Sequence, residues 1–294
     1  MIRVEHLTHA YEPGRPPALQ DVTCEIPDGA RIALVGPNGS GKTTLLRHLN
    51  GLLLPDEGDV LVHGRNTRDR AALPWIRQQV GMVFQNPDNQ IVGMTVEEDV
   101  AFGPGNLRLP AEEIRRRVDR ALDTVGLRGF GDRAPHELSS GEKQLVAMAG
   151  VLAMEPSTIV LDEPTAYLDP SGRRRVREVM KQLHASGVTV IHVTHDMNEV
   201  GDADEVLVLA GGRIFLQDAP SRLLLRSEDL RRIGLEPPVV RELMERLRAA
   251  GLDVRPDVLS VDEAHAELLA LLGDDSGLRI KGVRGRGQRA EGQD

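Results

Sequence analysis

Cysteine is almost absent from this chain of 294 residues, in which Cys24 is the single example. A lone cysteine excludes an intramolecular disulfide framework and fits a reducing compartment, so the cytoplasm is the expected location. We expect Cys24 to be a small buried hydrophobic residue rather than a reactive thiol. Aromatic residues are also scarce, at 2% of the chain, so each of them needs an individual explanation.

Positive charge and long hydrophobic runs are lacking as well. The net charge of −9 argues against a protein that coats nucleic acid, because phosphate binding requires clustered Lys and Arg. No apolar run approaches the roughly 18 residues of a membrane-spanning helix. No secretion signal is visible either, since strand-like alternation begins at the first residues. Any link to a membrane is therefore expected to pass through a partner protein.

The most informative feature that is present is a glycine-rich phosphate-binding loop. Residues 36–43 read Gly-Pro-Asn-Gly-Ser-Gly-Lys-Thr and follow an apolar strand at 31–35. A strand, a glycine-rich loop and then a helix direct backbone N–H groups and a helix N-terminus at one anion. Lys42 would add charge for the β- and γ-phosphates, and the Thr43 hydroxyl would ligate Mg²⁺. We therefore predict nucleoside triphosphate binding by Gly36, Asn38, Gly39, Ser40, Gly41, Lys42, Thr43 and Thr44.

A second, acidic motif lies where the first one requires it. The apolar segment 158–161 ends in Asp162 and Glu163. The end of a strand would place Asp162 beside the loop, where it can hold Mg²⁺ directly or through water. Glu163 is then the candidate general base for the attacking water. Acidic pairs often begin helices, so this motif gains its catalytic interpretation from the loop.

Apolar strands alternate with helical patterns along most of the chain, which predicts an α/β fold with a mostly parallel sheet. Strands are expected at 2–7, 21–26, 31–35, 59–62, 80–85, 158–161 and 188–193. Helices are expected from Lys42 and at 95–109, 111–125, 141–154, 172–185, 239–250 and 261–272. A hairpin over 204–216 should turn at Gly211-Gly212. Residues 225–280 are expected to form a C-terminal helical appendage, followed by a disordered tail at 281–294.

Several shorter motifs occur in a fixed order around these two. They are Tyr11 ahead of Gly14, Gln85 in Val83-Phe-Gln, Leu138-Ser-Ser-Gly-Glu142, Ala166-Tyr-Leu-Asp169 and Val193-Thr-His-Asp196. Together they resemble the ATP-binding cassette ATPases, with an adenine-stacking aromatic, a glutamine loop, a signature, a D-loop and a histidine switch. The resemblance covers about residues 1–220, and its specificity comes from the order of the motifs.

The resemblance implies a P-loop ATP-binding cassette over residues 1–224. It would combine the mostly parallel sheet with an antiparallel β subdomain and a helical signature subdomain at about 86–156. Two cassettes would pair head to tail, so that Ser139 and Gly141 of one contact the γ-phosphate bound by the other. Gln85 and Asp162 would attend the Mg²⁺, His195 would contact the γ-phosphate and position water, and Tyr11 would stack on adenine.

The chain also departs from the family pattern. Ser140 replaces a glycine of the signature, Glu142 replaces its glutamine, and Tyr167 is bulkier than the usual D-loop residue. These changes favour an alternative function, a catalytically weak partner that acts as a nucleotide-gated clamp beside a better ATPase. The intact Lys42 and Glu163 oppose it. A DNA-repair cassette ATPase is a further alternative, but it needs a long coiled-coil insertion and a basic DNA path that the sequence lacks.

The segments 86–91 and 95–104, together with 234–263, resemble the energy-coupling factor and cobalt-import ATPases. This implies an ATPase subunit that powers import of a vitamin or a transition metal ion at the cytoplasmic face of the cell membrane. Its expected partners are a second cassette subunit, a transmembrane scaffold and a substrate-binding membrane subunit. Gln90, Ile91 and Val92, if exposed, would offer the scaffold a mixed polar and apolar surface. The alternative is a solvated loop without a partner.

Overall fold

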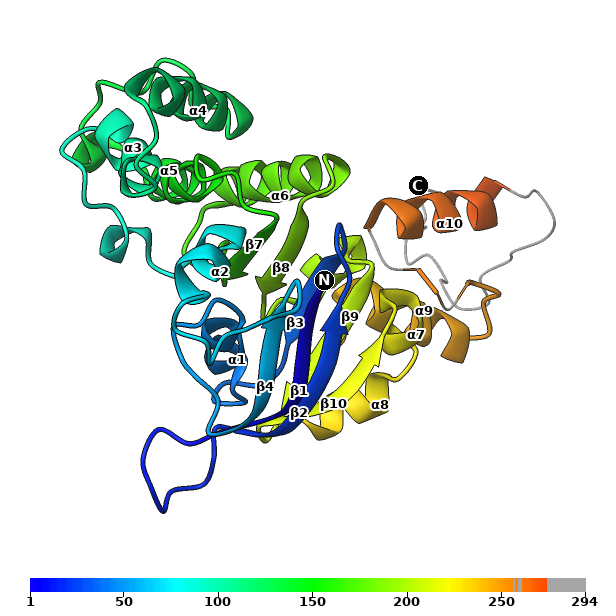
Figure 1. The fold of residues 1–294 in the computed structure, drawn as a ribbon. Helices are drawn as coiled ribbons and strands as arrows, with labels where there is room; N and C mark the ends of the chain where they lie inside the picture. The colour runs from blue at the N-terminus through cyan, green and yellow to red at the C-terminus, as the bar shows by residue number, and fades with distance from the viewer. Residues whose placement is uncertain (256, 259–260, 274–294) are drawn as a thin grey trace, which may run out of the picture.

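A computed structural model describes residues 1–255, 257–258 and 261–273 of the chain. Figure 1 shows a central body of two sheets, a helical part formed by α3, α4 and α5 at one end, and α10 at the other side. The predicted tail at 281–294 and the last residues of the predicted appendage, 274–280, lie outside the described residues.

The phosphate-binding loop lies at the carboxyl ends of the strands of the larger sheet. Within the described residues its six strands have the order β10-β9-β3-β8-β7-β6, and all neighbours are parallel except β10, which is antiparallel to β9. The strands are β3 (Arg31–Val35), β6 (Val80–Val83), β7 (Thr158–Asp162), β8 (Thr189–Val193), β9 (Glu205–Ala210) and β10 (Arg213–Asp218). Every residue of β3, β7 and β8 is buried, as expected for parallel strands covered on both faces. The predicted mostly parallel sheet is confirmed.

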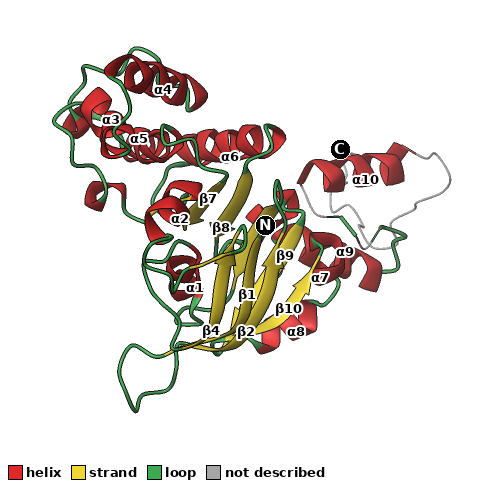
Figure 2. Ribbon diagram, in the orientation of Figure 1, coloured by secondary structure: helices red, strands yellow, loops and turns green. Residues whose placement is uncertain are grey.

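The smaller sheet is antiparallel and has the order β2-β1-β4-β5 among the described residues. Its strands are β1 (Ile2–His9), β2 (Leu19–Ile26), β4 (Glu57–Val62) and β5 (Arg65–Asn66). Helix α1 (Lys42–Leu49) shares one apolar core with both sheets, since Leu45 and Leu46 belong to the same cluster as Val4 and Val160. Figure 2 shows the two sheets and the helices around them. The helix that follows the phosphate loop is therefore fixed by packing on two sides.

The helical part is built around α5 (Ser140–Leu152), which packs against α3 (Val96–Asn106), α4 (Ala111–Thr124) and α6 (Pro170–Ala185). Both α3 and α5 begin with a capping box, Thr95 with Glu98 and Ser139 with Glu142. Such a box satisfies two N–H groups that a helix start leaves without partners. Two 3-10 turns, η1 (Pro87–Asn89) and η2 (Pro135–Glu137), complete this region. The short helix α2 (Leu73–Gln79) packs against β6 and contributes Ile76 to the core between the sheets.

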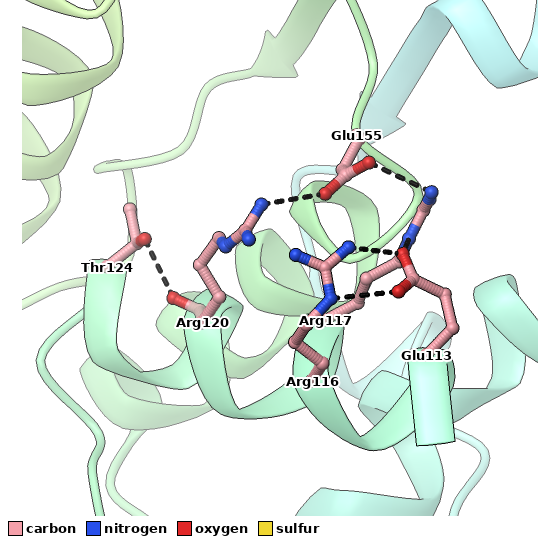
Figure 3. Close-up of polar contacts among 6 residues, drawn as sticks. All are labelled: Glu113, Arg116, Arg117, Arg120, Thr124 and Glu155. Carbon is pink, nitrogen blue, oxygen red and sulfur yellow. Dashed lines mark hydrogen bonds and ion pairs between the residues drawn. The ribbon is translucent and has the colours of Figure 1, made fainter. Parts of the chain in front are cut away.

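An ionic network fixes α4 against the connection between α5 and β7 (Figure 3). Arg117 donates to Glu113 at 2.7 Å and pairs with Glu155 at 2.9 Å, while Arg120 pairs with Glu155 at 2.9 Å. Hydrogen bonds from Arg116 and Arg117 lower the pKa of Glu113 to about 2. Because Arg117 pairs with carboxylates from both segments, it links α4 to the chain that follows α5, the helix that begins at the signature.

The C-terminal region consists of two differently packed parts. Helices α7 (Pro220–Leu224) and α8 (Ser227–Arg232), with the turn η3 (Met197–Asp202), share a core with β3 and β9. Helices α9 (Val239–Ala249) and α10 (Val261–Gly273) have a separate small core around Met244 and Val258. We therefore propose that the appendage begins near residue 236, rather than at 225. No helix in the described residues is both long and apolar enough to cross a bilayer.

The differences from the sequence-based expectations concern the ends of helices and strands and several short helices. The strand expected at 80–85 ends at Val83, so Gln85 lies in the following loop. Helices α5 and α6 begin at Ser140 and Pro170, because Ser139 and Asp169 act as their N-caps. Helices α2, α7 and α8 were not predicted, since segments of five to seven residues are too short to show helical periodicity.

Candidate active site

The phosphate-binding loop joins β3 to α1, and its glycines are required by close backbone contacts. A Cβ at Gly36 would overlap the carbonyl oxygen of Leu209, and one at Gly41 would lie 2.5 Å from the Ala18 oxygen. Gly41 also has φ +102°, which residues with a side chain rarely adopt. The loop therefore forms a narrow cradle at the N-terminus of α1, a geometry that suits an anion.

Among the described residues, the side chains of Lys42 and Ser40 have no hydrogen-bond partner outside the loop. Lys42 Nζ donates to the carbonyl oxygens of Gly36 at 2.8 Å and Pro37 at 3.0 Å. Burial lowers the pKa of Lys42, whereas the nearby charges of Glu163 and Asp162 raise it. The buried hydroxyl of Ser40 has no hydrogen-bond partner. A buried donor without a partner is unfavourable, so this cradle fits a phosphate group that would accept from Lys42 and Ser40.

The carboxylate of Asp162 lies at the end of β7, next to the phosphate loop. It is buried, and a hydrogen bond from the Thr43 hydroxyl connects it to the first turn of α1. Burial raises the pKa of Asp162, and the hydrogen bond from Thr43 opposes this effect. A hydroxyl and a carboxylate oxygen are ligands that Mg²⁺ prefers. Of the three residues predicted to hold the metal, Thr43 and Asp162 thus lie next to each other, whereas Gln85 bonds to Glu163.

Two of the predicted catalytic residues, Gln85 and His195, lie close to the same carboxylate oxygen of the third, Glu163. Gln85 Nε2 donates to Glu163 Oε2 at 2.9 Å, and His195 Nδ1 lies 3.5 Å from the same Oε2. Glu163 has φ +47°, a conformation that is strained for a residue with a side chain and that often marks functional sites. The ends of β7 and β8 are adjacent in the sheet, which is why residues 32 positions apart in sequence meet here.

Tyr11 lies beside the first turn of α1, where the sequence predicts an adenine-stacking residue. Its ring is 58% exposed, and its hydroxyl is 3.1 Å from Thr44 Oγ1. His9 meets the Tyr11 ring edge to face, with centroids 5.2 Å apart, and His48 of α1 in turn meets His9 at 4.7 Å. The two buried histidines were not predicted. They form a stack that supports an exposed aromatic ring, and such a ring can receive a planar base.

The signature residues form a separate group at the start of α5. The Ser139 hydroxyl donates to Glu142 Oε2 at 2.7 Å, and the Ser139 N–H donates to the same oxygen at 2.9 Å. These two hydrogen bonds, the hydroxyl bond first, lower the pKa of Glu142, so the side chain is anionic at neutral pH. Gly141 is buried, whereas Ser140 is exposed. In this chain the Ser139 hydroxyl is therefore already bonded to its own helix turn.

Two contacts near these segments were not expected from sequence. Lys143 of α5 pairs with Asp88 of η1 at 2.7 Å, which connects the signature helix to the loop that carries Gln85. Glu199 of η3 accepts hydrogen bonds from Thr165 and Thr194. The Lys143–Asp88 and Glu199–Thr165 contacts join positions that are distant in sequence, and no local pattern marks them.

The fold and these motifs define the class of the protein. Residues 19–166 match the family described as ABC transporter, and the chain belongs to this family of ATP-binding cassette ATPases. The chain is 49% identical over 270 residues to a protein named cobalt import ATP-binding protein CbiO from Syntrophus aciditrophicus, covering 92% of this chain and 96% of the relative. It is also 49% identical over 267 residues to a protein named energy-coupling factor transporter ATP-binding protein EcfA1 from Caldanaerobacter subterraneus, covering 90% and 96%.

Solved structures agree with this assignment. CbiO1 from Clostridium perfringens, described as part of the ABC transporter complex CbiONQ, superposes with a TM-score of 0.72 at 39% identity, covering 83% of this chain and 98% of that one. A dimeric ATP-binding cassette in a post-hydrolysis state with ADP and Pi gives a TM-score of 0.68 at 32% identity, covering 75% and 99%. The predicted family and fold class are confirmed by these similarities.

Proposed function

We propose that this chain is the ATP-hydrolysing subunit that energises import of a vitamin or a transition metal ion of the cobalt or nickel type. The observation that carries the proposal is the convergence of Gln85, Glu163 and His195 on one oxygen, in a chain with an anion cradle formed by the phosphate loop. The names of the relatives support the transported substrate class. The protein would act as a peripheral subunit at the cytoplasmic face of the cell membrane.

In this proposal the phosphate cradle and Lys42 bind the triphosphate of ATP, and Tyr11 stacks on its adenine. Thr43, Asp162 and Gln85 would hold Mg²⁺, which neutralises charge on the β- and γ-phosphates when bound. Glu163 accepts a proton from the attacking water, and His195 orients that water toward the γ-phosphate. Most of the catalysis is then positioning and charge stabilisation rather than covalent chemistry.

We further propose that a second cassette subunit completes the site. Ser139 and Gly141 lie at the N-terminus of α5, where backbone N–H groups favour an anion. They would contact the γ-phosphate held by the partner's loop. The dimeric cassette with ADP and Pi supports such an arrangement. Because Lys42, Asp162, Glu163 and His195 are all intact, a subunit that hydrolyses ATP is favoured over the catalytically weak clamp. We propose that it pairs with a second copy of itself, with a heterodimer as the alternative.

Replacing Glu142 with glutamine is expected to strengthen ATP-dependent dimerisation by about three- to tenfold. The glutamine amide can still cap α5, but it removes a negative charge near the phosphate that Ser139 would contact. Two like charges about 4 Å apart repel by ~1 kcal/mol or more. The measurement is the protein concentration at half-maximal dimer in a Glu163→Gln background. Glu98→Gln in the equivalent capping box of α3 is the control. Equal midpoints for the Glu142 and Glu98 variants would contradict the expectation.

The expected docking surface for the membrane scaffold is an apolar groove between β6 and the helical part. Its volume is about 410 Å³, and its lining includes Leu52, Met82, Phe84, Val92, Phe102 and Met154. Val92 and Phe102 are 64% and 59% exposed, whereas Gln90 is turned inward, where its Oε1 accepts from the Phe84 N–H at 3.0 Å. Ile91 packs partly against the helical core. We therefore propose a scaffold contact centred on Val92 and Phe102, with Gln90 in the wall of the groove and the exposed Asp88 in the adjoining turn η1.

Asp88→Ala is expected to lower substrate uptake at least about fivefold, corresponding to ~1 kcal/mol of lost contact with the scaffold, while intrinsic ATP hydrolysis is retained. Gln90→Ala should also uncouple transport, but through the loop that Gln90 supports. Uptake of cobalt, nickel and vitamins would be measured in cells, and hydrolysis with the purified protein. Asp229→Ala is a matched control, because Asp229 is likewise a surface aspartate in an ion pair, with Arg226 at 2.8 Å. Normal uptake by the Asp88 variant, or an unimpaired Glu163→Gln strain, would refute the transport proposal.

A further inference from the structure

A single buried carboxylate connects the segments that carry Glu163 and His195. Glu199 of η3 is 6% exposed, and its Oε2 accepts hydrogen bonds from Thr165 Oγ1 at 3.0 Å and Thr194 Oγ1 at 2.9 Å. A carboxylate can only accept hydrogen bonds, so both hydroxyl protons point toward Glu199. The positions of the two threonines are therefore fixed by one oxygen atom.

Each threonine belongs to a segment with a predicted catalytic residue. Thr165 follows Glu163 by two positions, in the turn after β7, and Thr194 directly precedes His195 at the end of β8. Because the Thr194 hydroxyl donates to Glu199, its lone pair is free to accept from the Asp196 N–H at 3.0 Å. Glu199 thus orients the backbone on the far side of His195 through Thr194.

Glu163 and His195 lie close together, and the backbone at Glu163 is strained. Glu163 Oε2 lies 3.5 Å from His195 Nδ1, and Glu163 adopts φ +47°, which persists only when the surroundings hold it in place. A hollow of about 290 Å³ lies beside these residues and is lined by Glu163, Thr165, Thr194, His195 and Glu199 among others. Because this hollow leaves one side of the two segments without packing, the hydrogen bonds from Thr165 and Thr194 to Glu199 restrain the segment of Glu163 relative to that of His195.

We infer that Glu199 is a positioning residue for ATP hydrolysis, which holds Glu163 and His195 at their mutual distance through Thr165 and Thr194. This inference rests on the proposed hydrolytic function. Within the described residues, the side-chain hydrogen bonds of Glu199 are to Thr165 and Thr194, so its effect should be on the chemical step rather than on nucleotide affinity.

The alternative is that Glu199 is only one more acid that stabilises the fold. Asp202 on the same turn provides the comparison, because it is also partly buried and accepts from Arg177 at 3.0 Å and Lys181 at 3.3 Å. Its contacts in the described chain are with basic side chains, and the predicted catalytic segments are not among them. Loss of either acid should lower the melting temperature, but only Glu199 should affect catalysis.

The test is steady-state ATP hydrolysis by purified full-length Glu199→Ala, Glu199→Gln and Asp202→Asn, with melting temperatures measured in parallel. We expect Glu199→Ala to lower kcat about 10- to 100-fold, the scale at which misplaced catalytic groups act, with KM for ATP within about threefold of wild type. Glu199→Gln should recover most of kcat, since its amide oxygen can accept from both threonines. Asp202→Asn should lower stability and leave kcat unchanged.

Equal kcat values for Glu199→Ala and Asp202→Asn, or a Glu199→Ala effect confined to KM, would overturn the inference. If Glu199→Ala does not fold, Thr165→Val removes one of the two hydrogen bonds with little change of shape, and kcat must then fall at unchanged KM. A wild-type protein that binds ATP but does not hydrolyse it would instead refute the proposed function, so the two failures are distinguishable.

Discussion

Replacement of Glu163 by glutamine is expected to reduce ATP hydrolysis by about 10²- to 10⁴-fold, the range of a lost general base, without loss of ATP binding. The amide has the shape of the carboxylate but cannot accept the proton of the attacking water. In the structure Glu163 Oε2 accepts from Gln85 Nε2 at 2.9 Å and lies 3.5 Å from His195 Nδ1. The other carboxylate at the end of β7 is that of Asp162, which is buried. Single-turnover phosphate release would measure the rate.

The control for this variant is Glu137→Gln, which changes a carboxylate that caps η2 by accepting from the Ala134 N–H at 3.1 Å. Hydrolysis should remain at the wild-type rate in that protein. If Glu163→Gln retained more than about a tenth of the wild-type rate, Glu163 would not be the base, and the strained backbone at that position would need another explanation.

The second large effect is expected for Lys42→Ala, which should weaken ATP binding about 10- to 100-fold. A hydrogen bond to a charged group is worth ~1.5–3 kcal/mol, and each 1.4 kcal/mol corresponds to a factor of about ten in affinity. The Lys42 ammonium lies within the cradle, bonded to the oxygens of Gly36 and Pro37. Isothermal titration with ATP would measure the dissociation constant directly.

Lys181→Ala is the matched comparison, because Lys181 is a lysine of α6 that pairs with Asp202 at 3.3 Å. Its removal should leave ATP affinity unchanged. A dissociation constant for Lys42→Ala within about threefold of wild type would contradict the assignment of the cradle as the triphosphate site.

Much of the candidate site could be predicted from sequence because each part of it is a local pattern at a strand end. The glycine-rich loop follows β3, Asp162 ends β7, and His195 follows β8. Carboxyl ends of parallel strands lie at one edge of a sheet, and β3, β8 and β7 are neighbours. The assembly of these patterns therefore follows from the fold class alone, although the catalytic roles stay predictions.

The parts that could not be predicted depend on contacts between distant residues. Glu199 meets Thr165 across 34 positions, and Lys143 meets Asp88 across 55. Nothing in the composition of either segment selects the partner. The inward direction of the Gln90 side chain was also unexpected, because a polar residue in a loop is usually solvated. Here the partly buried Phe84 N–H needs an acceptor, and Gln90 Oε1 provides it.

The departures in the signature have a structural consequence that bears on both proposed functions. Ser139 donates its hydroxyl proton to Glu142, so contact with a γ-phosphate in the partner's loop requires this proton to turn away from the carboxylate. The cost of this rearrangement separates a slow but working ATPase from a clamp. Whether two copies of this chain form a complete site is therefore the central question.

Light scattering on Glu163→Gln, with and without Mg-ATP, would show whether two copies of this chain form a complete site. Removal of the base should trap the closed state, so we expect a monomer that doubles in mass when Mg-ATP is added. The dimer should be lost again when Ser139 is also replaced by alanine. A protein that binds ATP and remains monomeric would refute the proposed homodimer, because this chain's own signature would then not complete the site.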